Sequence, residues 1–484
     1  MKESSETSST SKRQLRKPKS NNGCRTCRLR RVKCDETPIT CKRCIASGFK
    51  CDGYDTERLS YKRNPTKVTA PAEYYFRTLL PDKTTDERRS FNYFHSFTVP
   101  MMNGWFDHRV WNRLVLQMAQ SEPAVCHAIV AVSALQEVSE SCGLAILPED
   151  ISDRTHRFAL YQYSRSLKYL TVRMGSNDPH VRNTVLVCCI LFIVFELLRG
   201  NYDQAILHLQ NGMHVLGAGK FDYHALYQAH PALERNVEDS LAAALVHLDL
   251  QSAHFGASNT HTQLDLALLE DRGGCWPKPV EFESLQDAWV MRDRIFLQFC
   301  MFSALCETLS EADITADFAT LSTEQKKQQI QLLNFAHALD ALEQTCIQRG
   351  AMSEKDRGSL ELLRMHHMGV SVITDSCLIK SPKVIFRIYS ERFDKVVDLA
   401  EQITARFLDR RRAAGPRLTL LMETGILGPM CLVIDKCQNV AIAQRALRVM
   451  ESWPHREGLW DSTLASNVAS GRIMNIQEDA DTAI

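Results

Sequence analysis

Six cysteines within one short segment constrain this chain more than any other feature of its sequence. They are Cys24, Cys27, Cys34, Cys41, Cys44 and Cys51. Residues 1–22 are polar throughout and the total of 17 cysteines is odd, so we expect neither a secretory signal nor a disulfide framework. In a reducing compartment, clustered cysteines more often bind metal than form disulfides.

The six cysteines form an internal repeat. The segments "CRTCRLRRVKC" (24–34) and "CKRCIASGFKC" (41–51) share one spacing and are offset by 17 residues. Zinc takes four tetrahedral ligands, and thiolates suit it well. The segment contains no histidine. Six sulfurs therefore complete two four-ligand shells only if two of the sulfurs are shared, which predicts a site for two zinc ions.

The two repeats differ in charge. The first carries Arg25, Arg28, Arg30, Arg31 and Lys33 and no acidic residue between its cysteines, whereas the second is less basic. The stretch "RLRRVK" is long enough for one or two helical turns, which fit the major groove of DNA. An arginine can donate two hydrogen bonds to the O6 and N7 atoms of guanine. These cations could alternatively neutralise the net negative charge of six thiolates and two zinc ions.

The overall charge balance hides a basic head on an acidic body. Residues 1–67 contain 18 Lys+Arg and 7 Asp+Glu, a net charge of +11, whereas residues 68–484 carry 40 and 50, a net charge of −10. A concentrated basic segment is the electrostatic signature of a nucleic-acid-binding protein. We therefore expect contacts with nucleic acid to be confined to the head.

The cysteine spacing resembles that of the fungal six-cysteine binuclear zinc-cluster transcription factors. The resemblance implies that Cys24 and Cys41 bridge the two zinc ions. The remaining ligands would be Cys27 and Cys34 for one ion and Cys44 and Cys51 for the other.

The same resemblance implies that the partner is double-stranded DNA with GC-rich, CGG-like triplets. Arg30 and Arg31 would contact the base edges. Arg28 and Lys33 would contact phosphates, which position a protein on DNA without reading its sequence. Many members of the family dimerise through a coiled coil after the cluster, but no sustained heptads follow here. A monomer and a homodimer formed by the body therefore both stay open.

The rest of the chain predicts an all-α protein, a small zinc-cluster head joined by a linker to a large multi-helix domain. Trp111, Leu114, Val115 and Met118 follow helical spacing, and no run shows the alternation of a strand. We place a disordered basic arm at 1–22, the DNA-binding domain at 23–54, a linker at 55–73, the helical regulatory domain at 74–465 and a C-terminal tail at 466–484.

One segment of the body is strongly apolar. Residues 183–195, "NTVLVCCILFIVF", contain no charge, but a membrane-spanning helix needs about 20 such residues. The segment therefore predicts a buried central helix, and we expect no membrane partner. The residues that follow, 196–220, predict an antiparallel helix pair with a Gly-Asn turn.

The body also resembles a known domain. Residues 94–135, "FHSFTVPMMNGWFDHRVWNRLVLQMAQSEPAVCHAIVAVSAL", and 452–460, "SWPHREGLW", resemble the start and the closing segment of the fungal-specific transcription factor domain. The resemblance covers roughly residues 90–465 and implies a regulatory role.

No catalytic motif accompanies these features. The chain lacks H-E-x-x-H, G-x-S-x-G and dinucleotide-binding glycine patterns, and its best histidine groupings, His366–His367 and His247 with His254, lack a third ligand. We therefore expect a nuclear, RNA polymerase II-type, DNA-binding regulator that works with the transcription machinery, and not an enzyme. The alternatives are a zinc-dependent protein-interaction module, or an enzyme or ligand-binding protein with a site in the helical body.

Overall fold

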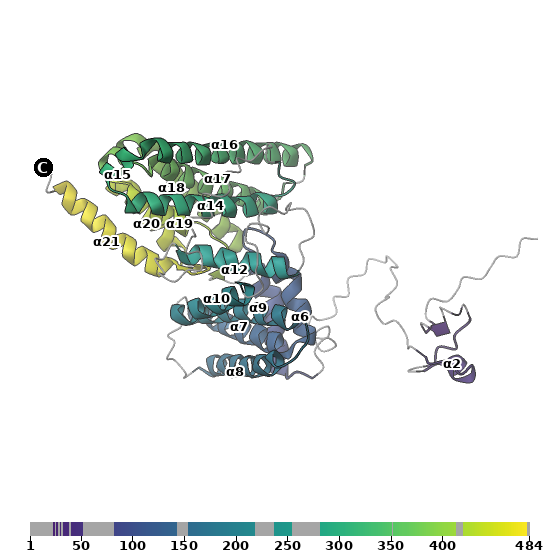
Figure 1. Cartoon of the computed structure of the whole chain (residues 1–484). Helices are drawn as coiled ribbons and strands as arrows, with labels where there is room; N and C mark the ends of the chain where they lie inside the picture. The colour runs from purple at the N-terminus through teal and green to yellow at the C-terminus, as the bar shows by residue number, and fades with distance from the viewer. Residues whose placement is uncertain are drawn as a thin grey trace, which may run out of the picture. The chain divides into compact units, whose positions relative to one another are not determined.

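The chain forms two compact units, residues 1–69 and 70–484, and each is described by itself. The computed structural model describes residues 23–24, 26–27, 30, 32–37, 40–51, 82–142, 153–217, 237–253, 281–350, 352–412 and 420–481. The predicted N-terminal arm and the linker at 55–73 lie outside these residues. Both units are helical, which confirms the predicted all-α fold with a small head and a large body (Figure 1).

Short elements open the body. They are the helices α4 (Thr85–Tyr93), α5 (Val99–Met102) and α6 (Val115–Ser121) and the π-helical turns η1 (Phe94–Thr98) and η2 (Val110–Leu114). A capping box starts α4, because the Thr84 side chain accepts the Glu87 N–H and the Glu87 carboxylate accepts the Thr84 N–H.

A layer of long helices follows around one apolar centre. It comprises α7 (Pro123–Cys142), α8 (Arg154–Met174), α9 (Val181–Leu198), α10 (Tyr202–Gly217) and α12 (Val237–Ala253). By length and composition α9 could cross a membrane, yet 78% of its residues are buried inside the body. Contacts with α7, α8, α10 and α12 account for this burial. The predicted buried central helix is therefore present.

The helices α9 and α10 form the predicted pair. They are separated by three residues. Gly200 in this turn has a backbone φ of +67°, which residues with a Cβ atom rarely adopt. The Asn201 N–H donates to the Glu196 carbonyl at 2.9 Å, which closes the end of α9.

The second half of the body is a further set of packed helices. They are α14 (Leu285–Thr308), α15 (Glu311–Ala316), α16 (Phe318–Gln348), α17 (Glu354–Ser376), α18 (Pro382–Arg412), α19 (Leu427–Lys436), α20 (Val440–Ser452) and α21 (Ser462–Asp481). Figure 1 shows α14, α16, α17 and α18 stacked on the side of the body away from α8.

The predicted C-terminal tail differs from the structure. Its boundary at 465/466 falls inside α21, which buries Ala469, Ile473 and Ile476 and packs against α19 and α20. These apolar residues at helical spacing make α21 a part of the body.

Three two-residue strands join segments that are distant in the sequence. The strand β1 (Leu420–Leu421) pairs in parallel with β2 (Arg456–Glu457), which pairs antiparallel with β3 (Trp460–Asp461). No alternating pattern in the sequence indicated these strands, and they leave the all-α class of the body unchanged. Strands of two residues are too short to produce a detectable alternating pattern.

Buried carboxylates hold the segments around these strands together. The Glu457 carboxylate accepts the backbone N–H groups of Gly425, Ile426 and Leu427 at 2.8, 2.7 and 3.1 Å, at the start of α19. The His455 Nε2 atom lies 2.9 Å from the same carboxylate. The segment "SWPHREGLW" thus supplies a buried cap to α19.

A second buried carboxylate, that of Glu423, accepts backbone N–H groups of the opening segment of the body. Its carboxylate accepts the N–H groups of Trp105 at 2.9 Å and Phe106 at 2.8 Å, and His108 Nε2 lies 3.0 Å away. These bonds span more than 300 residues of sequence, so the two ends of the body hold each other in place.

A buried histidine beneath α4 is held in its neutral form. The Lys83 ammonium lies 3.1 Å from His127 Nε2 and donates to it, while Nδ1 lies 2.6 Å from the Gln162 side-chain oxygen and donates to it. Burial, together with the charges of Lys83 and Arg165, lowers the pKa of His127 to about 4, against the opposing effects of the Gln162 hydrogen bond and of Glu87.

This histidine makes the stability of the body depend on pH. The unfolded chain, with an ordinary histidine pKa near 6.5, takes up the proton before the folded state does. The contribution of neutral His127 is therefore complete above about pH 6.5 and is lost as the pH falls towards 4, by about 3 kcal/mol in total. We expect His127→Gln to flatten the fall of unfolding free energy between pH 6.5 and 4, measured by denaturant titration. An unchanged slope would show that other groups cause the acid sensitivity.

Candidate metal centre and nucleic-acid interface

The two cysteine repeats adopt related local structures. In the first, the Arg30 N–H donates to the Thr26 carbonyl and the Val32 N–H to the Cys27 carbonyl, both at 3.1 Å, which forms a helical turn. In the second, α2 (Lys42–Ala46) begins after Cys41, whose side chain accepts the Cys44 N–H. Each repeat therefore places its C-x-x-C pair at the start of a helical turn.

The structure brings all six cysteine sulfurs together. They form two groups of four, and within each group every sulfur lies within 4.8 Å of the others. The groups are Cys24, Cys27, Cys34 and Cys41, and Cys24, Cys41, Cys44 and Cys51. Cys24 and Cys41 belong to both groups, as the predicted sharing of two sulfurs requires.

The sulfur separations fit zinc. Four thiolates at about 2.3 Å from one ion in a tetrahedron lie about 3.8 Å apart. The Cys24 and Cys41 sulfurs are separated by 3.6 Å, and the pairs Cys24–Cys44 and Cys27–Cys41 by 3.7 Å. Cys27 and Cys44, which belong to different groups, also lie 3.7 Å apart, closer than two shells that share an edge would place them, so these two sulfurs would have to separate when both ions bind. The donor set consists of the soft ligands that zinc prefers.

Backbone N–H groups point at these sulfurs in a repeated pattern. The Cys24 N–H donates to the Cys34 sulfur at 3.4 Å, and the Cys41 N–H to the Cys51 sulfur at 3.5 Å. The Cys27 N–H donates to the Cys24 sulfur at 3.4 Å, and the Cys44 N–H to the Cys41 sulfur at 3.3 Å. Hydrogen bonds of this kind favour the thiolate form, which is the form that binds metal.

Burial of the sulfurs away from water opposes these hydrogen bonds, because it favours the protonated thiol over the thiolate. It raises the pKa of Cys24 to about 12 and also raises the pKa values of Cys27 and Cys41. Without a metal, these thiols stay protonated at neutral pH. Metal binding must therefore displace protons from the sulfurs, which couples zinc affinity to pH.

Asp35 is a structural residue of the head that the sequence analysis missed. Its carboxylate accepts the backbone N–H groups of Lys42 at 3.0 Å and Arg43 at 2.9 Å, and also accepts the Thr37 hydroxyl. The bonds from Thr37 and Arg43 hold the pKa of Asp35 well below its usual range. Asp35 therefore caps α2 and ties the first repeat to the second. The only sequence signal was an acid directly after the third cysteine.

The structure describes two of the four predicted DNA-contacting residues. Lys33 is exposed, whereas Arg28 and Arg31 lie outside the described residues. The Arg30 guanidinium carbon lies 3.8 Å from the centre of the Phe49 ring in the second repeat. Arg30 is therefore held by a cation–π contact between the repeats, which the sequence did not reveal.

The histidine groupings of the body do not converge on a shared site. The Nε2 atoms of His366 and His367 lie 2.6 and 3.0 Å from two different carbonyl oxygens, those of Gly425 and Leu332. Within the part of the chain that the structure describes, the two cysteine groups of the head are the only clusters suited to a metal ion. His254 lies outside that part.

A pocket lies beside α12 and α14. Its lining includes His247, Arg292, Phe296 and Trp460. His247 is already hydrogen-bonded, because its Nδ1 atom lies 2.8 Å from Asp293 and its Nε2 atom 3.0 Å from the Gln251 amide. The pocket therefore offers no histidine free to act as a catalytic base.

Comparison with known proteins identifies the family. The fungal Zn(2)-Cys(6) binuclear cluster domain matches residues 22–61, and the fungal specific transcription factor domain matches residues 89–346, more than half of the chain. The chain therefore belongs to the fungal zinc-cluster transcription factor family. The resemblance inferred from the cysteines and from the body is confirmed.

Characterised relatives agree with this assignment. The aspercryptin biosynthesis cluster-specific transcription regulator atnN of Emericella nidulans is 29% identical over 322 residues, which are 60% of this chain and 48% of the relative. The transcription regulator lscL of Purpureocillium lilacinum is 27% identical over 217 residues, 43% of this chain and 49% of the relative. The chain thus spans about half the length of these relatives. No solved structure matches it.

The family that matches the body and both relatives are described as transcription factors or regulators. The prediction that the chain is not an enzyme is confirmed by these descriptions.

Proposed function

We propose that this protein is a nuclear, sequence-specific DNA-binding transcription regulator of the RNA polymerase II type. Its head holds two zinc ions and reads GC-rich, CGG-like triplets, and its helical body controls the output through the transcription machinery. The observation that supports this most directly is the arrangement of six sulfurs as two groups of four that share Cys24 and Cys41.

The residues of the head divide into a cage and a reading surface. The six thiolates would hold zinc, which when bound supplies the cross-links that keep the two repeats together. Asp35 and the Arg30–Phe49 contact hold the same repeats from outside the cage. The first repeat, with its uninterrupted basic residues, would then lie in the major groove as a preformed turn.

The stacked position of Arg30 is compatible with base recognition. The Arg30 guanidinium carbon lies over the Phe49 ring and its Nη1 atom is buried, so the hydrogen bonds to guanine would come from the other guanidinium nitrogens. Phe49 would therefore orient Arg30 before DNA binds and reduce the entropy lost on binding. Arg31 would supply the second base contact, and Arg28 and Lys33 would pair with phosphates.

Selection of bound DNA from a random library by the full-length protein tests the proposal. We expect enrichment of CGG-like triplets, and the number and spacing of triplets would report whether one subunit or a homodimer binds. Substituting Arg30→Ala with Arg31→Ala should weaken the selected site roughly 30-fold or more, because each guanine contact contributes about 1–3 kcal/mol. Affinity would be measured by fluorescence anisotropy.

The matched control is Lys42→Ala with Arg43→Ala in the second repeat, which removes the same charge. It should weaken all DNA sequences to a similar, smaller extent, since phosphate contacts do not discriminate. Equal losses in both variants would contradict the assignment of the first repeat as the reading surface. Failure to enrich any sequence with the zinc-loaded protein would favour a zinc-dependent protein-interaction module instead.

A further inference from the structure

The helix α8 carries charge of one sign only. Its 21 residues, "RTHRFALYQYSRSLKYLTVRM", include five arginines and lysines and no aspartate or glutamate. The chain as a whole contains almost equal numbers, 58 basic and 57 acidic residues, and its body is acidic. Solubility alone therefore does not explain why this acidic body carries a helix with basic charge only.

The exposed residues of α8 form a continuous surface. Arg154, Arg157, Tyr161, Lys168 and Val172, which we call the α8 basic face, repeat at helical spacing and are all exposed. They extend over residues 154–172, a rise of about 27 Å along the helix. The other side of the helix buries residues such as Ala159, Ser166 and Leu170 against the rest of the body. Figure 1 shows α8 at the outer edge of the body, beyond α7.

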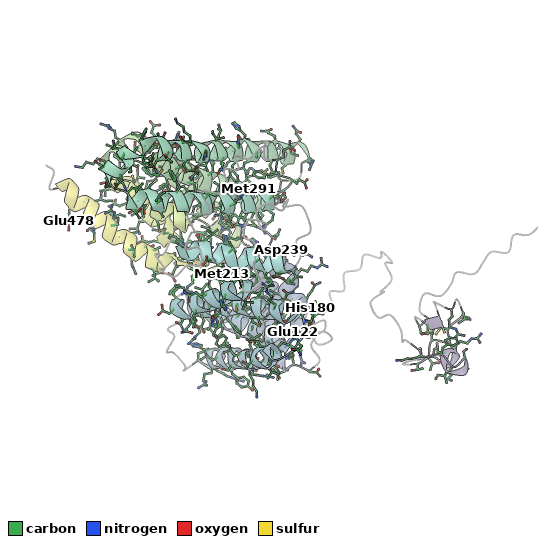
Figure 2. All side chains as sticks on the ribbon, in the orientation of Figure 1. Glu122, His180, Met213, Asp239, Met291 and Glu478 are labelled. Atoms are coloured by element: carbon green, nitrogen blue, oxygen red, sulfur yellow. The ribbon has the colours of Figure 1, made fainter. Side chains whose placement is uncertain are left out.

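The cations of α8 fall into two groups. Arg165 pairs with Glu87 at 2.7 Å. Arg173 pairs at 2.9 Å with Glu122, which is labelled in Figure 2. Among the described residues, none forms an ion pair with Arg154, Arg157 or Lys168. The helix therefore stabilises the body with two of its cations and presents three to solvent.

Large apolar side chains lie between these cations. Tyr161 is 60% exposed and Val172 is 72% exposed, and Tyr169 and Met174 are exposed beside them. Exposed aromatic and aliphatic groups interspersed with cations are typical of a surface that binds protein, whose partner supplies both carboxylates and apolar contacts.

We propose that the α8 basic face docks an acidic amphipathic segment of another protein. Carboxylates on the segment would pair with Arg154, Arg157 and Lys168, and its apolar residues would cover Tyr161 and Val172. A second copy of this chain fits poorly, because a symmetric contact would oppose the same cations. Nucleic acid fits less well, because its phosphates would leave Val172 and Met174 without apolar partners.

The test uses the full-length protein and a fluorescein-labelled helical peptide of about 20 residues, with glutamates along one edge of a leucine face. Charge reversal by Arg154→Glu, Arg157→Glu and Lys168→Glu should weaken peptide binding at least about 10-fold at low salt, since three favourable contacts become repulsive. Removing the apolar contacts by Tyr161→Ser with Val172→Ser should weaken binding about 3-fold or more.

The control reverses three exposed cations elsewhere in the body, Lys326→Glu, Lys383→Glu and Arg387→Glu, with the same change in net charge. Thermal unfolding followed by circular dichroism confirms that each variant is folded. Peptide binding that is reduced equally by both triple reversals would overturn the proposal, because it would reflect net charge alone. The proposal would also fail if the α8 reversal weakened binding of non-specific duplex DNA or of anionic vesicles but left peptide binding unchanged.

Discussion

Chelation of zinc abolishes specific DNA binding and leaves the helical content of the body nearly unchanged: this is the largest effect that we expect. The buried core of the head consists of the five cysteines Cys24, Cys27, Cys34, Cys41 and Cys44, with Val32 and Cys51 packed against them. The described residues of the head form no other apolar core that could keep it folded once the metal is removed. The binding free energy of a structural zinc, about 10–16 kcal/mol, therefore supplies the folding free energy of the head.

We expect the body to keep its fold without this metal. It forms a separate compact unit, and its apolar core extends through helices from α4 to α21. Circular dichroism before and after chelation, together with anisotropy on the selected DNA site, measures both halves of the expectation. Simultaneous loss of the helical signal and of DNA binding would contradict the independence of the two units.

Substitution of a shared ligand sharpens the same prediction. We expect two zinc ions per native chain by elemental analysis, and a loss of both in Cys41→Ser because that sulfur belongs to both groups. Cys34→Ser should weaken one shell first, since Cys34 belongs to one group only. The matched control is Cys346→Ser in the body, which should retain both ions. A native content of one zinc ion per chain would exclude the shared arrangement.

The second large effect concerns the body. Glu457→Ala should lower the free energy of unfolding by about 3–5 kcal/mol, because it leaves three buried N–H groups at the start of α19 without an acceptor and removes the partner of His455. Glu457→Gln, which keeps one of the two acceptor oxygens, should lose less. Denaturant titration followed by the helical signal measures each value.

The control for this variant is Glu451→Ala on the exposed side of α20, which should change stability by less than about 0.5 kcal/mol. DNA binding by the head should stay intact in both variants under conditions where the body is folded. If Glu457→Ala and Glu451→Ala unfold at the same denaturant concentration, the buried carboxylate does not stabilise the junction.

Local sequence was sufficient for much of the fold. The cysteine count and spacing predicted two four-ligand shells that share two sulfurs, and the family resemblance implied which cysteines belong to each; the structure gathers the same cysteines into two groups of four. The apolar run at 183–195 predicted α9, since a helix without a polar face must be surrounded by others. Short-range geometry and apolar periodicity are properties of the chain itself, and they are visible without knowledge of its neighbours.

Long-range polar contacts were not predictable in this way. The carboxylates of Glu423 and Glu457 look like ordinary surface acids in the sequence, yet both are buried and accept backbone N–H groups from other elements. The strand β1 was equally hidden, because two residues form a strand only when a partner at 456–457 lies alongside.

The sequence by itself predicted a group of six cysteines suited to zinc, and it determined the basic head on an acidic body and the helices whose apolar spacing repeats every three to four residues. Only the tertiary structure decided that Arg30 lies over Phe49, that Asp35 caps α2, that α21 belongs to the body and that α8 presents exposed cations. The physical reason is that burial and pairing depend on which distant residues meet. A periodic pattern reports the side of a helix that will be buried, but not the partner that will bury it.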